Sequence, residues 1–144
     1  MLNKLNIGSG EYGIEGYLNI DDASDYDGNV EEFLAAVDDP ENIEYQICDG
    51  NDMPFEDNSF DEIFSNQCVG KYVTNYYDIV RILKPGGTII LGLWSDVVAK
   101  VMMELLIRDI EIIGVEWLNG CQCDIENDDD NITLKVIGRK IGEQ

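Results

Sequence analysis

Glycine and acidic residues directly follow apolar stretches of this sequence, at the points where strands are predicted to end. Gly8 and Gly10 follow the first apolar stretch, and Asp21 and Asp49 end the next two. Because the carboxyl ends of parallel strands meet at one edge of a sheet, these groups would lie close together. Glycine lets a ligand approach the backbone, and carboxylates accept hydrogen bonds from hydroxyl and amino groups. The pattern therefore predicts a binding site for a nucleoside.

The elements that would position these groups alternate between strands and helices. Apolar stretches predict strands at residues 5–7, 16–20, 43–48, 60–64, 88–93, 109–117 and 131–138. Helical spacing and capping residues predict helices at residues 29–37, 72–83 and 97–107, with Asn29 and either Ser95 or Asp96 as N-caps. The continuously apolar stretch 88–93 is typical of a central strand that is covered on both faces. The order indicates an α/β fold with a doubly wound, mostly parallel sheet.

Three connections refine this fold. Residues 8–16 are too few for a usual parallel crossover, so the first crossover helix is expected to be shortened or replaced by a loop. Pro85-Gly86-Gly87 is expected to end the preceding helix and turn the chain. The last two strands follow each other without a helix between them, which favours an antiparallel C-terminal hairpin at the edge of the sheet.

Composition limits the classes of function. A chain of 144 residues fits a single domain, 1–144, and its 30 acidic against 9 basic residues give a net charge of −21. This charge disfavours nucleic acid as a partner and would attract a cationic ligand. No apolar stretch is long enough for a membrane span and no signal peptide is visible, so the expected location is cytoplasmic. Cys121 and Cys123, in a chain without histidine, make a poor zinc site, so no metal is expected.

Several motifs resemble the class I S-adenosylmethionine-dependent methyltransferases, over nearly the whole chain. The most specific are SFDEI at residues 59–63 and RILKPGG at residues 81–87. DMPF at residues 52–55 matches a loop of this family that ends in Leu-Pro-Phe. The opening LNIGSG at residues 5–10, closely followed by GYLNID at 16–21, is similar to compact members of the methyltransferase type 11 kind. The resemblance implies a Rossmann-like sheet of seven strands in the order 3-2-1-4-5-7-6, with the last strand antiparallel.

The resemblance also implies S-adenosylmethionine as the cofactor. Carried over to this sequence, its cofactor-binding residues are Asn6, Gly8, Ser9, Gly10, Asp21, Asp22, Asp49, Gly50, Asn51 and Asn66. In the family, residues placed like Asp21 accept the ribose hydroxyls, and residues placed like Asp49 accept from the adenine amino group. Asn66 would face the amino-acid part or the sulfonium of the cofactor. The alternatives are a plain tight turn at Gly8 and Gly10 and an Asp-Gly turn at Asp49.

The sequence departs from the family where many small-molecule members carry Glu-His after the fourth strand. Residues 66–72 read NQCVGKY, and the chain contains no histidine. No catalytic residue is therefore assigned, although the sulfonium is already an activated methyl donor. Side chains that could act as a base are Lys71, Tyr72, Tyr76, Tyr77 and Asp96. The acceptor pocket is expected among loops 22–28, 66–77 and 94–97.

Two functions follow from these observations. The first is methyl transfer from S-adenosylmethionine to a small-molecule or sugar-like acceptor. The second is a catalytically inactive methyltransferase-fold protein that acts as a binding or partner subunit. A nicotinamide dehydrogenase is disfavoured, because the acid that follows the Gly8-x-Gly10-x-x-Gly13 motif comes too early. A homodimer is expected to cover apolar surface beside the short first connection or on the terminal hairpin.

Overall fold

The computed structural model describes residues 2–118 and 133–142 of the chain. Its elements in chain order are β1 (Lys4–Ile7), β2 (Leu18–Asp21), the 3-10 helix η1 (Ser24–Tyr26), α1 (Val30–Ala36), β3 (Glu44–Ile47), β4 (Phe60–Asn66), α2 (Tyr76–Ile82), β5 (Leu83–Trp94), α3 (Val98–Leu106), β6 (Ile110–Leu118) and β7 (Thr133–Lys140). Cys121 and Cys123 lie outside the described residues.

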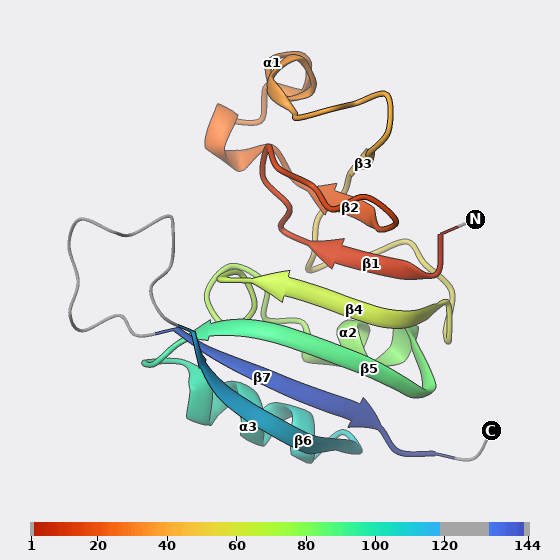
Figure 1. Cartoon of the computed structure of the whole chain (residues 1–144), viewed down its shortest axis with the longest axis vertical. Helices are drawn as coiled ribbons and strands as arrows, with labels where there is room; N and C mark the ends of the chain where they lie inside the picture. Colours follow the sequence, from red (N-terminus) through yellow and green to blue (C-terminus); the bar gives the residue numbers. More distant parts are fainter. Residues whose placement is uncertain (1, 119–132, 143–144) are drawn as a thin grey trace.

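The seven strands form one sheet in the order β3-β2-β1-β4-β5-β7-β6, as the resemblance implied (Figure 1). Strands β1 to β5 pair in parallel, whereas β7 runs antiparallel to both β5 and β6. The Rossmann-like fold and the antiparallel C-terminal hairpin are therefore confirmed. Among the described residues, no helix is long and apolar enough to cross a membrane.

Strand β5 lies inside the sheet between β4 and β7, which confirms the central position predicted for residues 88–93. Its side chains Ile89, Leu91 and Leu93 are buried in the main core. Helices α2 and α3 lie on the same side of the sheet, behind it in Figure 1. A second, smaller core forms where Phe33 of α1 packs against side chains of η1 and β3.

Helix α2 is shorter than predicted, and the turn expected after it lies within the range of strand β5. The helix begins at Tyr76, because the Asn75 side chain caps it by accepting a hydrogen bond from the Asp78 backbone N–H at 3.2 Å. Strand β5 then starts at once at Leu83 and continues through Pro85-Gly86-Gly87. The pairing register between β4 and β5 shifts in this region, and Gly86 has a φ of 82°. Because β5 advances from Leu83 to Thr88 while β4 advances only from Phe60 to Glu62, the chain turns at these glycines as predicted before the regular part of β5 begins.

Asn29 caps α1 as predicted, by accepting from the backbone N–H of Glu32 at 3.1 Å. The cap predicted for α3 is wrong, because the N-cap residue is Val97, whose side chain makes no capping hydrogen bond. Asp96 instead pairs with Lys71 at 3.8 Å. The buried face of α3 carries Val101 and Leu105, whereas Leu106 is 53% exposed.

A loop replaces the first crossover helix, within the range that the sequence predicted. Asn19 of β2 is fully buried and holds this loop. Its Oδ1 accepts from the Ile14 backbone N–H at 2.8 Å, and its Nδ2 donates to the carbonyls of Ile14 and Tyr17, each at 3.0 Å. A buried amide thus supplies the hydrogen bonds that fix the loop where most crossovers would use a helix.

Candidate functional site

A cavity of about 440 Å³ opens at the carboxyl ends of β1, β2, β3 and β4. Eight of the ten cofactor-binding residues expected from the sequence line it: Gly8, Gly10, Asp21, Asp22, Asp49, Gly50, Asn51 and Asn66. The other two, Asn6 and Ser9, do not. Asn6 is buried within the sheet, and the Ser9 hydroxyl donates to the carbonyl of Gly10 at 3.2 Å. The topology therefore gathers most of the predicted residues around one cavity.

The two glycines of the first loop have different surroundings. Both have positive φ, 71° at Gly8 and 60° at Gly10. A Cβ added at Gly8 would lie 2.6 Å from the Sγ of Cys68, whereas a Cβ at Gly10 would meet no atom within 4 Å. Gly8 is therefore needed to make room for Cys68, and the missing side chain of Gly10 leaves backbone open to the cavity.

Asp21 ties the first two loops together through both carboxylate oxygens. Its Oδ2 accepts from the backbone N–H of Gly10, and its Oδ1 accepts from the backbone N–H of Ala23, both at 2.9 Å. A carboxylate can accept about four hydrogen bonds, so each oxygen keeps capacity for one more donor. Two neighbouring hydroxyl groups, such as those of a ribose, match this remaining capacity.

Asp49 and Asn51 organise the opposite side of the cavity. The Oδ1 of Asp49 accepts from the backbone N–H of Asn51 at 2.8 Å. The Asn51 side chain then donates to the Tyr72 carbonyl at 2.9 Å and accepts from the Thr74 N–H at 2.8 Å. This network holds the loop before α2 against the end of β3. The remaining oxygen of Asp49 makes no hydrogen bond within the described part of the chain, so it can accept from an amino group.

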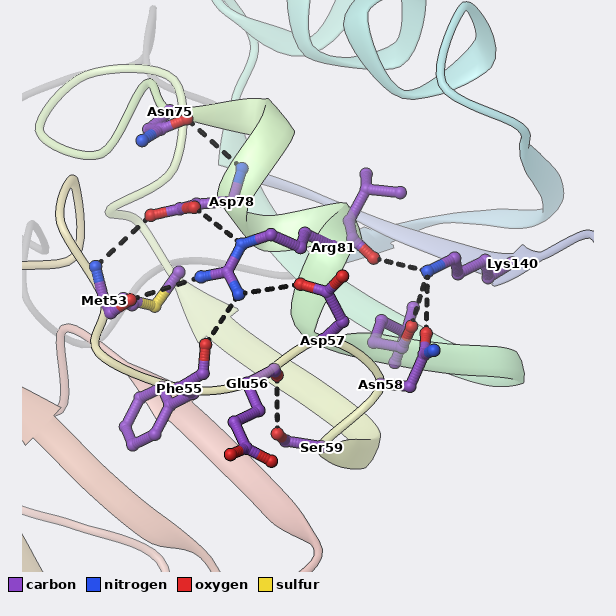
Figure 2. Close-up of polar contacts among 12 residues, drawn as sticks. Met53, Phe55, Glu56, Asp57, Asn58, Ser59, Asn75, Asp78, Arg81 and Lys140 are labelled. Atoms are coloured by element: carbon purple, nitrogen blue, oxygen red, sulfur yellow. Dashed lines mark hydrogen bonds and ion pairs between the residues drawn. The ribbon is translucent and has the colours of Figure 1, made fainter.

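Arg81 fixes the loop that continues from this side of the cavity (Figure 2). Its guanidinium donates to the carbonyls of Met53 at 3.2 Å and Phe55 at 2.6 Å. It also pairs with Asp78 at 2.9 Å and with Asp57 at 3.0 Å. Since a guanidinium offers five donors in a rigid fork, one side chain of α2 can hold the whole loop. Two motifs are therefore in contact: Arg81 of RILKPGG holds Met53 and Phe55 of DMPF through their backbone carbonyls.

Sequence reasoning assigned none of the cavity's other residues to the cofactor, although Ser24, Asp25, Gln67, Cys68, Tyr72 and Val73 lie in the loops expected to hold the acceptor. Its further lining residues are Ile7, Ile20, Ser24, Asp25, Cys48, Gln67, Cys68, Tyr72 and Val73. Two of them are cysteines, and Cys68 is the more perturbed: burial, followed by the nearby carboxylates of Asp21 and Asp22, raises its pKa to about 12. Ile7, Ile20 and Cys48 alone fall outside every predicted site loop, because their apolar side chains were assigned to strand interiors and not to a binding surface.

The five candidate bases have different positions. Tyr72 lines the cavity, and its ring meets that of Trp94 edge-on, with 6.4 Å between centroids. Lys71 lies over the Trp94 ring at 4.3 Å and pairs with Asp96. The remaining two tyrosines do not line the cavity. Tyr76 has a buried hydroxyl with no partner among the described residues, and Tyr77 lines a separate cavity.

These observations define a Rossmann-like protein with a nucleoside-sized cavity at the usual edge of its sheet. A family model described as "Methyltransferase domain" matches residues 20–91, which is half of the 144-residue chain. The chain belongs to this methyltransferase family, whose cofactor is S-adenosylmethionine. The cavity fits this cofactor, because Asp21 and Asp49 leave acceptor capacity where the ribose and the adenine would lie. No curated protein matches the sequence.

Solved structures show the same fold at low sequence identity. An S-adenosylmethionine-dependent methyltransferase from Methanosarcina mazei has a TM-score of 0.73 and 14% identity, over 97% of this chain and 92% of the other. A chain from the complex of a Haloferax volcanii methyltransferase with the Trm112 methyltransferase activator has a TM-score of 0.68 and 16% identity, over 98% and 82%. The geranyl diphosphate C-methyltransferase of Streptomyces coelicolor A3(2), solved with S-adenosyl-L-homocysteine, has a TM-score of 0.64 and 13% identity, over 96% and 73%.

Proposed function

We propose that this chain transfers a methyl group from S-adenosylmethionine to a small-molecule or sugar-like acceptor. The observation that carries the proposal is the position of Asp21 and Asp49. They end neighbouring strands of a methyltransferase sheet, line one cavity and each retain acceptor capacity. In this proposal residues 1–144 act as one domain.

Each lining group has a defined task in the proposal. Asp21 accepts hydrogen bonds from the two ribose hydroxyls, and the free oxygen of Asp49 accepts from the adenine amino group. The Asn66 amide, which makes no hydrogen bond within the described part of the chain, contacts the amino-acid part. The bound cofactor supplies a sulfonium that is already an activated methyl donor. The protein then contributes alignment and exclusion of water.

The acceptor would lie at the rim of the cavity, in loops 22–28, 66–77 and 94–97. Tyr72 and Trp94 place two aromatic rings there, and Lys71 adds a cation that is only partly neutralised by the 3.8 Å contact with Asp96. Aromatic rings of this kind bind the flat faces of sugars and of other rings. No general base is assigned to the reaction.

The second candidate function is a methyltransferase-fold subunit without catalysis of its own. One feature favours it: the backbone N–H groups of Gly8 and Ser9 both donate to the Ile20 carbonyl, and that of Gly10 donates to Asp21. The glycine loop therefore has no free backbone donor for a cofactor. The Haloferax volcanii complex is an example of this fold bound to an activator protein.

A calorimetric titration with S-adenosylmethionine and with S-adenosylhomocysteine separates the two functions. Saturable binding at micromolar to millimolar concentration, weakened in a variant of Asp21, supports the methyltransferase. A screen of small hydroxylated and amine acceptors with labelled cofactor then follows. No heat and no rise in melting temperature at millimolar concentration of either ligand would favour the partner subunit.

A further inference from the structure

We propose that the cavity selects its ligand by charge and binds the cationic S-adenosylmethionine more tightly than its neutral demethylated product. This inference rests on the proposed function and concerns the same cavity. S-adenosylmethionine carries a sulfonium, an ammonium and a carboxylate, and therefore one net positive charge. Loss of the methyl group removes the sulfonium and leaves a ligand with no net charge. Charge is thus the largest electrostatic difference between the cofactor and its product.

The cavity is lined by carboxylates without a basic residue beside them. Asp21, Asp22, Asp25 and Asp49 all line it, and no lysine or arginine of the described residues does. The basic residues nearest to the lining in sequence are Lys4, Lys71 and Arg81, and Lys4 lies over the Tyr17 ring at 5.5 Å. Lys71 pairs with Asp96 at the rim, and Arg81 pairs with Asp57 and Asp78 on α2. The field inside the cavity is therefore negative, in a chain whose net charge is already −21.

The cavity offers little to the carboxylate that both ligands share. The backbone donors of residues 8–10 are used within the protein, as described above. The Asn51 amide donates to the Tyr72 carbonyl, and that of Gln67 donates to the Thr133 hydroxyl. Among these groups the Asn66 amide remains for the carboxylate. No lysine or arginine of the described residues lines the cavity to neutralise this carboxylate, so the sulfonium supplies an attraction that the product lacks.

The four aspartates are held in place to different degrees. Asp21 and Asp49 are fixed by backbone donors, and Asp22 accepts from the Ser24 N–H at 2.9 Å. The Asp25 carboxylate makes no hydrogen bond within the described part of the chain. One positive charge in a cavity lined by four partly screened carboxylates is worth about tenfold or more in affinity at low ionic strength. This selectivity would let the product leave while the cofactor is retained, and so limit product inhibition.

The experiment compares three ligands by calorimetry at low and at high salt. They are S-adenosylmethionine, S-adenosylhomocysteine and an analogue that carries a protonated amine in place of the methyl sulfonium. We expect the two cationic ligands to bind about tenfold or more tightly than the neutral product at low salt. This ratio should fall several-fold at high salt, because screening weakens charge interactions and leaves packing unchanged.

A charge-matched pair of variants tests the origin of the selectivity. Asp22→Asn with Asp25→Asn removes two carboxylates of the cavity while keeping the oxygen that accepts from Ser24. Glu41→Gln with Glu56→Gln removes two exposed carboxylates that do not line it. The first pair should lower the ratio of the two affinities about threefold or more, and the second should leave it unchanged. Melting curves check that both pairs fold.

The outcomes distinguish this inference from the proposed function. Equal affinity for all three ligands, tighter binding of the neutral product, or the same change of ratio in both variant pairs would overturn charge selection while leaving the cofactor site intact. Failure of all three ligands to bind would instead overturn the proposed function, and the charge selection with it.

Discussion

Asn6 donates a 2.9 Å hydrogen bond from its Nδ2 to the Oδ1 of Asn19, between β1 and β2, and both side chains are buried. The same Oδ1 accepts from the Ile14 N–H in the loop that replaces the first crossover helix. The side chain at position 6 must therefore be a donor. This gives Asn6 a structural role, although the sequence analysis expected it to bind the cofactor.

Asn6→Asp should destabilise the protein. The new carboxylate would place an oxygen against the Asn19 oxygen and leave a buried polar group without its partner, at a cost of about 1–3 kcal/mol in the free energy of unfolding. Urea denaturation monitored by circular dichroism measures this change. Asn3→Asp, the same substitution at an exposed position, is the control and should have little effect. Equal stability of the two variants would show that the Asn6–Asn19 contact is not needed.

Asp21→Ala should weaken both cofactor binding and the fold. Loss of the ribose acceptor should cost about 1–3 kcal/mol in binding of S-adenosylmethionine. Because the carboxylate also joins the N–H groups of Gly10 and Ala23, its removal should lower the melting temperature of the free protein as well. Calorimetry and thermal melting measure the two effects, and Asp38→Ala, at an exposed position outside the cavity, serves as the comparison. A variant that binds as tightly as the parent would remove Asp21 from the site.

Gly8→Ala and Gly10→Ala should differ although both glycines have positive φ. Both alanines are strained by the backbone conformation, by about 1 kcal/mol. The methyl at position 8 would also collide with Cys68, whereas the methyl at position 10 meets no atom within 4 Å. We expect Gly8→Ala to be the more destabilising by about 1–3 kcal/mol in chemical denaturation.

A double-mutant cycle tests whether Cys68 is the cause. Cys68→Gly should recover part of the loss in the Gly8→Ala background, because it removes both the Sγ and the Cβ that the new methyl would meet. Additive effects of the two substitutions would mean that another contact makes Gly8 necessary. Gly10→Ala should instead weaken ligand binding, since its methyl would project into the open space of the cavity.

The Cys68 thiol should be unreactive at neutral pH. Burial raises its pKa from 9.0 to about 12, so its thiolate population in the folded protein is at least about a hundredfold below that of the unfolded chain. The folded state favours the protonated thiol. This contribution to stability is complete below pH 9 and is lost as the pH rises from about 9 to about 12.

Alkylation by iodoacetamide, followed by peptide mass spectrometry, should label Cys68 readily only after unfolding. Rapid native labelling at pH 8 would contradict this assignment.

The sequence predicted the sheet well because its signals are local. Stretches such as 88–93 and the acids that end strands β2 and β3 lie where hydrophobic pattern and strand order place them. The failures have a different origin. The irregular start of β5 at Leu83 and the late start of α2 depend on pairing with β4 and on the Asn51 contacts, which no local pattern records. The cavity was likewise predicted at its strand ends, whereas Cys68 and Val73, expected only in an acceptor loop, line the same cavity through tertiary packing.

The last prediction concerns association of the chain with itself. Strand β6 is at the edge of the sheet, and three of its apolar side chains, Ile113, Val115 and Trp117, are 52%, 48% and 69% exposed. An edge strand with exposed apolar side chains is a template for pairing with a second chain. A symmetric homodimer through this hairpin would cover them.

Because the net charge of −21 opposes association, the dimer should tighten as salt screens this charge. Light scattering across a salt series measures this, and Val115→Lys with Trp117→Lys should give a monomer at every salt concentration. A parent protein that is monomeric throughout would refute the homodimer and would leave a different partner as the better explanation for the exposed strand.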